Sequence, residues 1–396
     1  MGDRRRVPIA LSAALALGAC APAVRLPPPP PPPVVATFVA QLGTDTVQFE
    51  WFERTATAIT GRMLTRSPRT VVRDFSYRYR EDGTIERMEF LSRAADLSSD
   101  SVIARTVVTF ANDTAYIETG IGDNARTQWI PARAPAVAWS GIPSYSMYEF
   151  AAQRAPQTVG DSVVLTVHFP PALGGVQPFV VKRVAPDSVT LWDRNLGTMR
   201  AVLDSVGRVL AFDGTGSSLN YVVTRVDSVM IDSVAVMFAA RDGSGGLGPV
   251  SPRDTVTATV HGANFMIEYG RPAVRGRQIF GAVVPWGRVW RTGANQATHF
   301  STDRDVVIGG LMVPRGTYTL WTLPTETGWH LIVNRQTGQW GTRHDPAYDL
   351  GRVPLEVRRL TDPVELLTFR IEPRPVGGML IVAWDTYEAS VPFSPR

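Results

Sequence analysis

The sequence predicts a mainly β protein with two domains: an N-terminal antiparallel meander or half-barrel with one helix, and a C-terminal antiparallel β-sandwich. Apolar and polar residues alternate over short segments, as Phe75, Tyr77 and Tyr79 do, which is the period of a strand with one buried face. Turn-forming Gly, Pro and Asp separate these segments. A glycine-rich stretch at 241–250 cannot support a helix or strand and is expected to link the domains.

The N-terminal domain is expected to span 45–240. A helix is expected within 134–153, regular only after Pro143, because proline interrupts a helix. An Asp-Ser/Thr-Val tripeptide recurs, for example at 161–163 and 232–234; Asp and Ser close turns and Val favours strands, so it predicts strand starts. Strands are expected at 75–80, 85–90, 102–110, 115–119, 162–169, 178–184, 188–193, 198–203, 207–213 and 219–226.

The C-terminal domain is expected to span 251–396. Its short strands are separated by Gly, Pro and Asp turns, which favours an antiparallel sandwich. These strands are expected at 255–261, 264–269, 298–302, 305–308, 317–323, 328–334, 364–372 and 379–384.

The chain begins with a secretory signal. Three arginines at 4–6 precede an apolar run at 7–17 that is too short to span a bilayer. The following Leu-Gly-Ala-Cys ends at Cys20 and resembles the lipobox of bacterial lipoproteins. That resemblance implies that 1–19 is a cleaved signal peptide and that acyl chains on Cys20 anchor the protein in the membrane. Ala21 then favours the outer membrane, with the protein facing the periplasm. A plain secretory signal with an incidental cysteine is the alternative.

Residues 20–44 are expected to form the anchor and a stalk. Seven consecutive prolines, 27–33, favour polyproline II, which reaches roughly 20 Å at about 3.1 Å per residue. A ligand for a proline-binding module is the alternative interpretation of this run.

Charge and cysteine content exclude several classes of function. The formal net charge is +4, and half of it comes from the signal segment, so the mature chain is nearly neutral and nucleic-acid binding is not expected. Cys20 is the single cysteine, so no internal disulfide and no thiol nucleophile are expected. No motif points to a cofactor, and the oligomeric state is left open.

Residues 251–396 carry several recognisable runs: Tyr-Gly-Arg-Pro at 269–272, Trp-Arg-Thr-Gly-Ala-Asn at 290–295 and Trp-Gly at 340–341. Together they resemble the bacterial family called domain of unknown function 2911, over essentially the whole domain. Gln296 departs from the acidic residue expected there. The resemblance implies a fold and no established chemistry.

The region 45–240 is faintly similar to the half-open barrels of Lol-type periplasmic lipid and lipoprotein carriers. The similarity rests on the meander of strands, the single helix and the anchor. It implies an apolar groove between sheet and helix; an ordinary sheet with a filled core is the alternative.

The segment 269–299 is the candidate binding site. Arginine forks bind carboxylates and phosphates and stack on indoles, and an asparagine adds directional hydrogen bonds. These parts predict non-catalytic binding of an anionic or glycan ligand. The alternative is that arginine–carboxylate pairs and tryptophans hold a long loop in place. The contact set is Arg271, Arg277, Trp286, Trp290, Arg291 and Asn295.

No catalytic or metal-binding residues are assigned. His299, His330 and His344 lack metal-ligand spacing, and there is no nucleophile elbow. Two further hypotheses stay open: a hydrolase of envelope glycans or peptides, and a lipid or lipoprotein carrier. The sequence does not locate the paired carboxylates of a glycosidase, and solubility explains the carboxylates near expected strand ends, which are Glu365, Glu372, Asp385 and Glu388.

Overall fold

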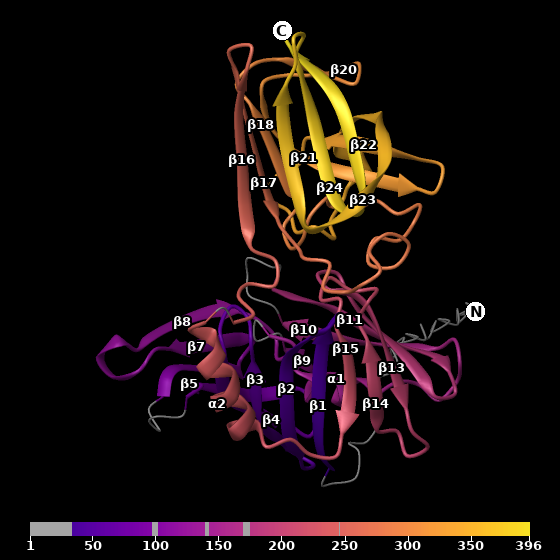
Figure 1. Ribbon diagram of the computed structural model, residues 1–396. Coiled ribbons are helices and arrows are strands. Elements are labelled where there is room, and N and C mark those ends of the chain that lie inside the picture. Colours follow the sequence, from indigo (N-terminus) through magenta and orange to yellow (C-terminus); the bar gives the residue numbers. More distant parts are fainter. Residues whose placement is uncertain (1–33, 97–101, 139–141, 169–174, 245) are drawn as a thin grey trace, which may run out of the picture.

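The computed structural model describes residues 34–96, 102–138, 142–168, 175–244 and 246–396. It shows two β-rich domains, one above the other in Figure 1, and confirms the predicted mainly β fold class. Cys20 and the proline run at 27–33 lie outside the described residues. Within the described ranges, no helix combines the length and the apolar character that crossing a membrane requires.

The N-terminal domain is built from strands and two α-helices. Its elements are β1 (Val34–Leu42), β2 (Asp45–Arg54), β3 (Ala58–Thr65), β4 (Val71–Tyr79), β5 (Ile85–Ala94), β6 (Val102–Ala111), β7 (Thr114–Thr119), β8 (Arg126–Pro131), β9 (Val137–Ala138), α1 (Tyr145–Ala152), β10 (Ser162–His168), β11 (Val176–Ala185), β12 (Ser188–Asp193), β13 (Gly197–Leu203), β14 (Val209–Asp213), β15 (Val222–Val226) and α2 (Ile231–Asp242).

The described strands of this domain form one fifteen-stranded sheet in the order β8 to β1, then β15 to β9. The first strand, β1, therefore lies in the interior of the sheet between β2 and β15. Neighbours pair antiparallel except β9, which runs parallel to β10. The chain leaves one edge at β8 and resumes at the other edge with β9, and α1 lies between β9 and β10.

The inner face of the sheet wraps around α1. The alternation predicted from sequence is confirmed in β4, where Phe75, Tyr77 and Tyr79 are all buried. Helix α1 begins after Pro143, as expected, and every one of its residues is buried. A cavity of only about 10 Å³ remains beside Tyr148, too small for a ligand. The described residues therefore form a filled core, and the groove implied by the carrier resemblance is not seen among them.

A buried carboxylate from the sheet holds the start of α1. Glu50 of β2 is fully buried and accepts hydrogen bonds from the backbone N–H groups of Tyr145 (2.8 Å) and Ser146 (3.0 Å). The hydroxyls of Ser144 (3.1 Å) and Ser146 (2.5 Å) donate to it as well. The first N–H groups of a helix lack intrahelical partners and favour negative charge. Burial raises the pKa of Glu50, and these hydrogen bonds oppose that shift.

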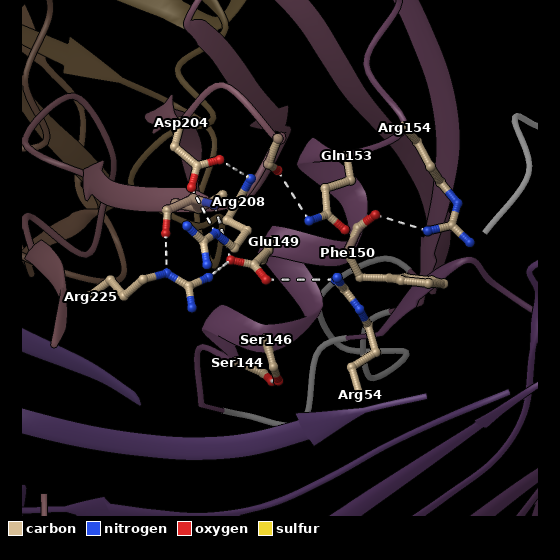
Figure 2. Close-up of polar contacts among 12 residues, drawn as sticks. Arg54, Ser144, Ser146, Glu149, Phe150, Gln153, Arg154, Asp204, Arg208 and Arg225 are labelled. Atoms are coloured by element: carbon tan, nitrogen blue, oxygen red, sulfur yellow. Dashed lines mark hydrogen bonds and ion pairs between the residues drawn. The ribbon is translucent and has the colours of Figure 1, made fainter. Parts of the chain in front are cut away.

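A second buried carboxylate ties the body of α1 to the same strands. Glu149 forms ion pairs with Arg54 of β2 (3.7 Å) and with Arg225 of β15, as Figure 2 shows. The backbone N–H of Val209 donates to it at 3.1 Å. Burial raises the pKa of Glu149, and the two arginines oppose that shift. Both glutamates thus fix α1 to the central strands.

The tripeptide does not begin a strand at every position in this domain. The tripeptide at 232–234 lies in helix α2, which packs on the outer face of the sheet against Phe49, Leu64 and Val72. The tripeptide at 204–206 forms a turn, in which the Asp204 carboxylate accepts from two backbone N–H groups.

Two segments near the domain boundaries also differ from the expectation. The segment 34–42, assigned from the sequence to the anchor and stalk, forms β1, which pairs with β2 on one side and β15 on the other. Helix α2 continues to Asp242, so the glycine-rich linker starts at 243 rather than 241.

The C-terminal domain consists of β16 (Arg253–Val260), β17 (Ala263–Gly270), β18 (Thr298–Thr302), β19 (Val306–Ile308), β20 (Leu311–Val313), β21 (Gly316–Thr325), β22 (Gly328–Asn334), β23 (Asp349–Pro373) and β24 (Gly378–Pro395).

All eight strands expected here are present, and β20 is an additional one. Among the described residues they form one nine-stranded sheet, in the order β16-β17-β18-β21-β22-β23-β24-β19-β20. Register shifts near Val364 interrupt the β23–β24 ladder, and such irregularities bend strands. The sheet folds over so that β16 and β20 both approach β23. The expected sandwich is therefore a single sheet closed around one core.

The Glu50 contacts generate a stability prediction. Glu50→Ala removes the acceptor for two backbone N–H groups and two hydroxyls, and hydrogen bonds to charged groups contribute about 1.5–3 kcal/mol each. We expect a loss of at least about 3 kcal/mol, which lowers the midpoint of the N-terminal domain by roughly 6–12 °C in differential scanning calorimetry. Glu81→Ala, at an exposed turn, is the control and should change stability by under about 0.5 kcal/mol. Equal midpoints for the two variants would contradict this role.

Candidate functional site

The two domains touch at a first contact between the β1–β2 turn and the loop after β17. The backbone N–H of Thr44 donates to the carbonyl of Arg275 at 3.0 Å, and the Arg275 guanidinium forms an ion pair with Asp45. Gly43 makes this approach feasible, because a Cβ there would lie 2.0 Å from the Arg275 carbonyl oxygen and φ is +60°. Arg275 is therefore an interdomain residue.

A second contact joins the β12–β13 turn to the loop before β23. The Thr342 hydroxyl is within hydrogen-bond distance of the carbonyl oxygens of Arg194 (3.1 Å) and Asn195 (3.2 Å). The neighbouring Arg343 guanidinium donates to the Asn195 side-chain oxygen. At the end of the linker, Val250 also donates to the Ser67 hydroxyl, at 3.2 Å.

A cleft of about 740 Å³ opens between the domains, and its walls include residues next to both contacts. This volume is typical of a small-molecule site. The C-terminal domain contributes residues from 283–295 together with Arg277, Gly341 and Trp384; the N-terminal domain contributes residues from 196–198 and 215–221. Three of the described lining residues are arginines, and none is Asp or Glu. The walls of the cleft thus carry positive charge without an acidic residue among them.

Arg291 lines this cleft and forms few hydrogen bonds with the described residues. Its Nε donates to the Gly293 carbonyl at 3.3 Å, and it forms no ion pair with any residue that the structure describes. Its aliphatic stem crosses Gly341, where a Cβ would lie 1.9 Å from Arg291 Cδ and 2.6 Å from the Asn295 carbonyl oxygen. Burial lowers the pKa of Arg291 to about 10, so the positive charge is held in a poorly solvated position.

Two further arginines line the cleft. Arg277 donates to the carbonyls of Ala273 (2.5 Å) and Val274 (3.0 Å) in its own loop. Burial, followed by repulsion from Arg275, lowers the pKa of Arg277 to about 10. Arg288 is exposed and, in the described part of the chain, has no ion-pair partner. None of the three guanidiniums therefore pairs directly with a carboxylate of the described ranges.

Indole rings form part of the apolar wall. Trp290 and Trp384 both line the cleft and stack with ring centroids 5.7 Å apart and planes at 16°. The Trp290 Nε1 donates to the Gly293 carbonyl at 3.2 Å. The Trp384 Nε1 is buried and donates to no described residue, although buried donors are normally paired.

The structure brings four of the six expected contact residues to the cleft: Arg277, Trp290, Arg291 and Asn295. The other two, Arg271 and Trp286, are not among its lining residues.

Arg271 instead holds its loop against the sheet. It donates to the Leu367 carbonyl and the Thr368 hydroxyl, both at 3.1 Å, and pairs with Asp254 at 3.4 Å. Trp286 packs into an aromatic cluster with Phe280, with ring centroids 5.9 Å apart. For these two residues the contacts favour the loop-holding alternative.

The residues predicted from the sequence to bind a ligand include none from the N-terminal wall of the cleft. The segment 215–221, between β14 and β15, is rich in Gly, Ser and Thr and resembles any solvent-exposed loop. Asn220 has a positive φ of 57°, and its Nδ2 donates to the Ser217 carbonyl at 2.9 Å. Its Oδ1 is buried and accepts from no described residue. Nothing in the local sequence signals that this loop faces another domain.

The remaining titratable candidates lie outside the cleft. His344 pairs with Asp349 at 2.8 Å, and among the described residues no cluster of three or more His, Cys, Asp or Glu could hold a metal ion. Glu372 and Glu388 are held in ion pairs with arginines, including Arg370. The pKa of Asp385 is raised, mainly by burial, with Glu365 contributing.

The contact of Arg291 with Gly341 generates a prediction. Gly341→Ala places a methyl group against the Arg291 stem and the Asn295 carbonyl, so the loop that carries both residues must shift. We expect a loss of about 1–3 kcal/mol, seen as a lower melting temperature of the C-terminal domain. Gly328→Ala is the matched control, since a Cβ there has no neighbour within 4 Å. If the two variants have the same melting temperature, the packing of Arg291 on Gly341 does not contribute to the stability of the domain.

Comparisons with known proteins characterise one domain. Residues 251–393 match the family described as "Protein of unknown function (DUF2911)". No curated protein matches the chain. A crystal structure of a DUF1089 family protein from Pseudomonas aeruginosa is similar at 13% identity and a TM-score of 0.31, over 42% of this chain and 89% of that one; so low a score supports no conclusion. The chain thus carries a C-terminal DUF2911 domain, to which the arginine-bearing wall of the cleft belongs.

Proposed function

We propose that the protein binds an anionic or glycan ligand in the interdomain cleft without catalysing its conversion. The observation that carries this proposal is the set of three cleft arginines, Arg277, Arg288 and Arg291, with no carboxylate among the described lining residues. A partly buried guanidinium without a counter-charge is unfavourable. An incoming carboxylate or phosphate would supply that charge through paired hydrogen bonds.

The two other hypotheses have less support. A glycosidase of the usual kind needs two carboxylates on either side of its substrate, and the described walls of the cleft offer none. Glu372 and Glu388 are already paired with arginines elsewhere. A lipid or lipoprotein carrier needs an apolar cavity, whereas α1 fills the inner face of the N-terminal sheet. Binding in the cleft is therefore the function that we favour.

We also propose that the protein acts at the cell envelope, anchored through acyl chains on Cys20 and facing the periplasm from the outer membrane. The support is the signal-like start and the Leu-Gly-Ala-Cys run. Two or more acyl chains give stable anchoring, because each buried methylene contributes about 0.8 kcal/mol.

The binding proposal predicts the effect of neutralising the cleft. Arg291→Gln and Arg277→Gln should each weaken anion binding about tenfold or more, because a charge-assisted hydrogen bond contributes about 1.5–3 kcal/mol. The measurement is isothermal titration of the full-length chain in mild detergent with inorganic phosphate, citrate, glucuronate and glucose 6-phosphate. Arg315→Gln, at an exposed site outside the cleft, should bind like the wild type. If the wild type binds none of these probes, or both cleft variants bind like it, the proposal fails.

The anchoring proposal predicts the effect of removing the thiol. Full-length Cys20→Ala should take up no radiolabelled palmitate in cells and should move from the membrane pellet to the soluble fraction. A variant that still sediments with membranes would overturn the role of Cys20.

A further inference from the structure

The two walls of the cleft differ in chemistry. The C-terminal wall carries all three arginines, together with Trp290 and Trp384. The described lining residues of the N-terminal wall carry no charged group, and five of them bear a hydroxyl: Thr198, Thr215, Ser217, Ser218 and Tyr221. A ligand that spans the cleft therefore meets cations on one side and uncharged hydrogen-bonding groups on the other.

A hydroxyl group of the N-terminal wall is available to a ligand. Ser218 lines the cleft and is partly exposed, and its hydroxyl forms no hydrogen bond with any described residue. Asn220 Oδ1 and Trp384 Nε1 also lack described partners, but both atoms are shielded from solvent and so do not face the open cleft. A ligand hydroxyl on this wall would therefore meet the Ser218 hydroxyl.

We infer that the cleft binds an acidic sugar, a carboxylate- or phosphate-bearing saccharide whose anionic group lies on the arginines of the C-terminal wall and whose hydroxyl groups lie on the 215–221 loop. A plain anion would leave the N-terminal wall unused, and a neutral sugar would leave the partly buried guanidiniums of Arg277 and Arg291 without a counter-charge. The indole rings add a flat apolar surface beside the charge, as sugar C–H faces require. This inference rests on the proposed function and adds the class of ligand and the role of the second domain.

The contribution of each wall is testable separately. Ser218→Ala removes a hydroxyl from the 215–221 loop. Arg291→Gln removes charge from the other wall. Isothermal titration of the full-length chain compares glucuronate and glucose 6-phosphate with acetate, inorganic phosphate and glucose.

The wild type should bind at least one acidic sugar about tenfold or more tightly than acetate, phosphate or glucose. Ser218→Ala should reduce that affinity about fivefold or more and leave phosphate binding unchanged, whereas Arg291→Gln should weaken both. Equal affinity for phosphate and the acidic sugars, or no effect of Ser218→Ala, overturns the inference while the proposed function survives. Absence of binding by every probe overturns both.

Discussion

The hydrogen bonds between Glu50 and the start of α1 are the interaction on which the N-terminal domain depends. The chain passes from the β8 edge of a wide sheet to β9 at the opposite edge, and α1 lies on the next connection, between β9 and β10. A helix laid across an apolar face leaves its first N–H groups without water. Glu50, from a central strand, accepts from two of them. The burial of one carboxylate thus permits the sheet to close around a filled core.

The cleft depends in turn on how the domains meet. Contacts at Gly43–Asp45 and at Thr342 hold the two domains close together, and the arginine-bearing loop lies between them. Arg275 pairs with a carboxylate of the N-terminal domain, whereas the partner of Arg291 among the described residues is a backbone carbonyl. The neighbouring arginines of one loop therefore have separate roles: Arg271 and Arg275 hold structure, and Arg277, Arg288 and Arg291 face the space between the domains.

Most strands could be predicted from the sequence, because the alternation of apolar and polar residues, as at Phe75, Tyr77 and Tyr79, depends only on which face of the strand is buried. The sequence was insufficient for β1, whose place is set by pairing with β15 almost two hundred residues later in the chain, and for α2, whose Asp-Ser-Val tripeptide also occurs in turns. Four expected site residues reach the cleft, yet Arg271 and Arg277 look alike in the sequence. Their difference comes from Leu367 and Asp254, which fold back onto only one of them. Ser218 gave no signal, since its place in the cleft requires a second domain.

The position of β1 has a mechanical consequence. Val34 directly follows the prolines, and β1 is hydrogen-bonded along both sides, to β2 and to β15. A force that pulls on Val34 from the preceding chain acts along β1. To extract β1, this force must break the hydrogen bonds to β2 and to β15 together, whereas an edge strand has only one such row of bonds. How long the domain withstands such a force is set by its unfolding rate. A tether attached at this point would load a strand that is paired on both sides and whose far end, Leu42, lines the cleft.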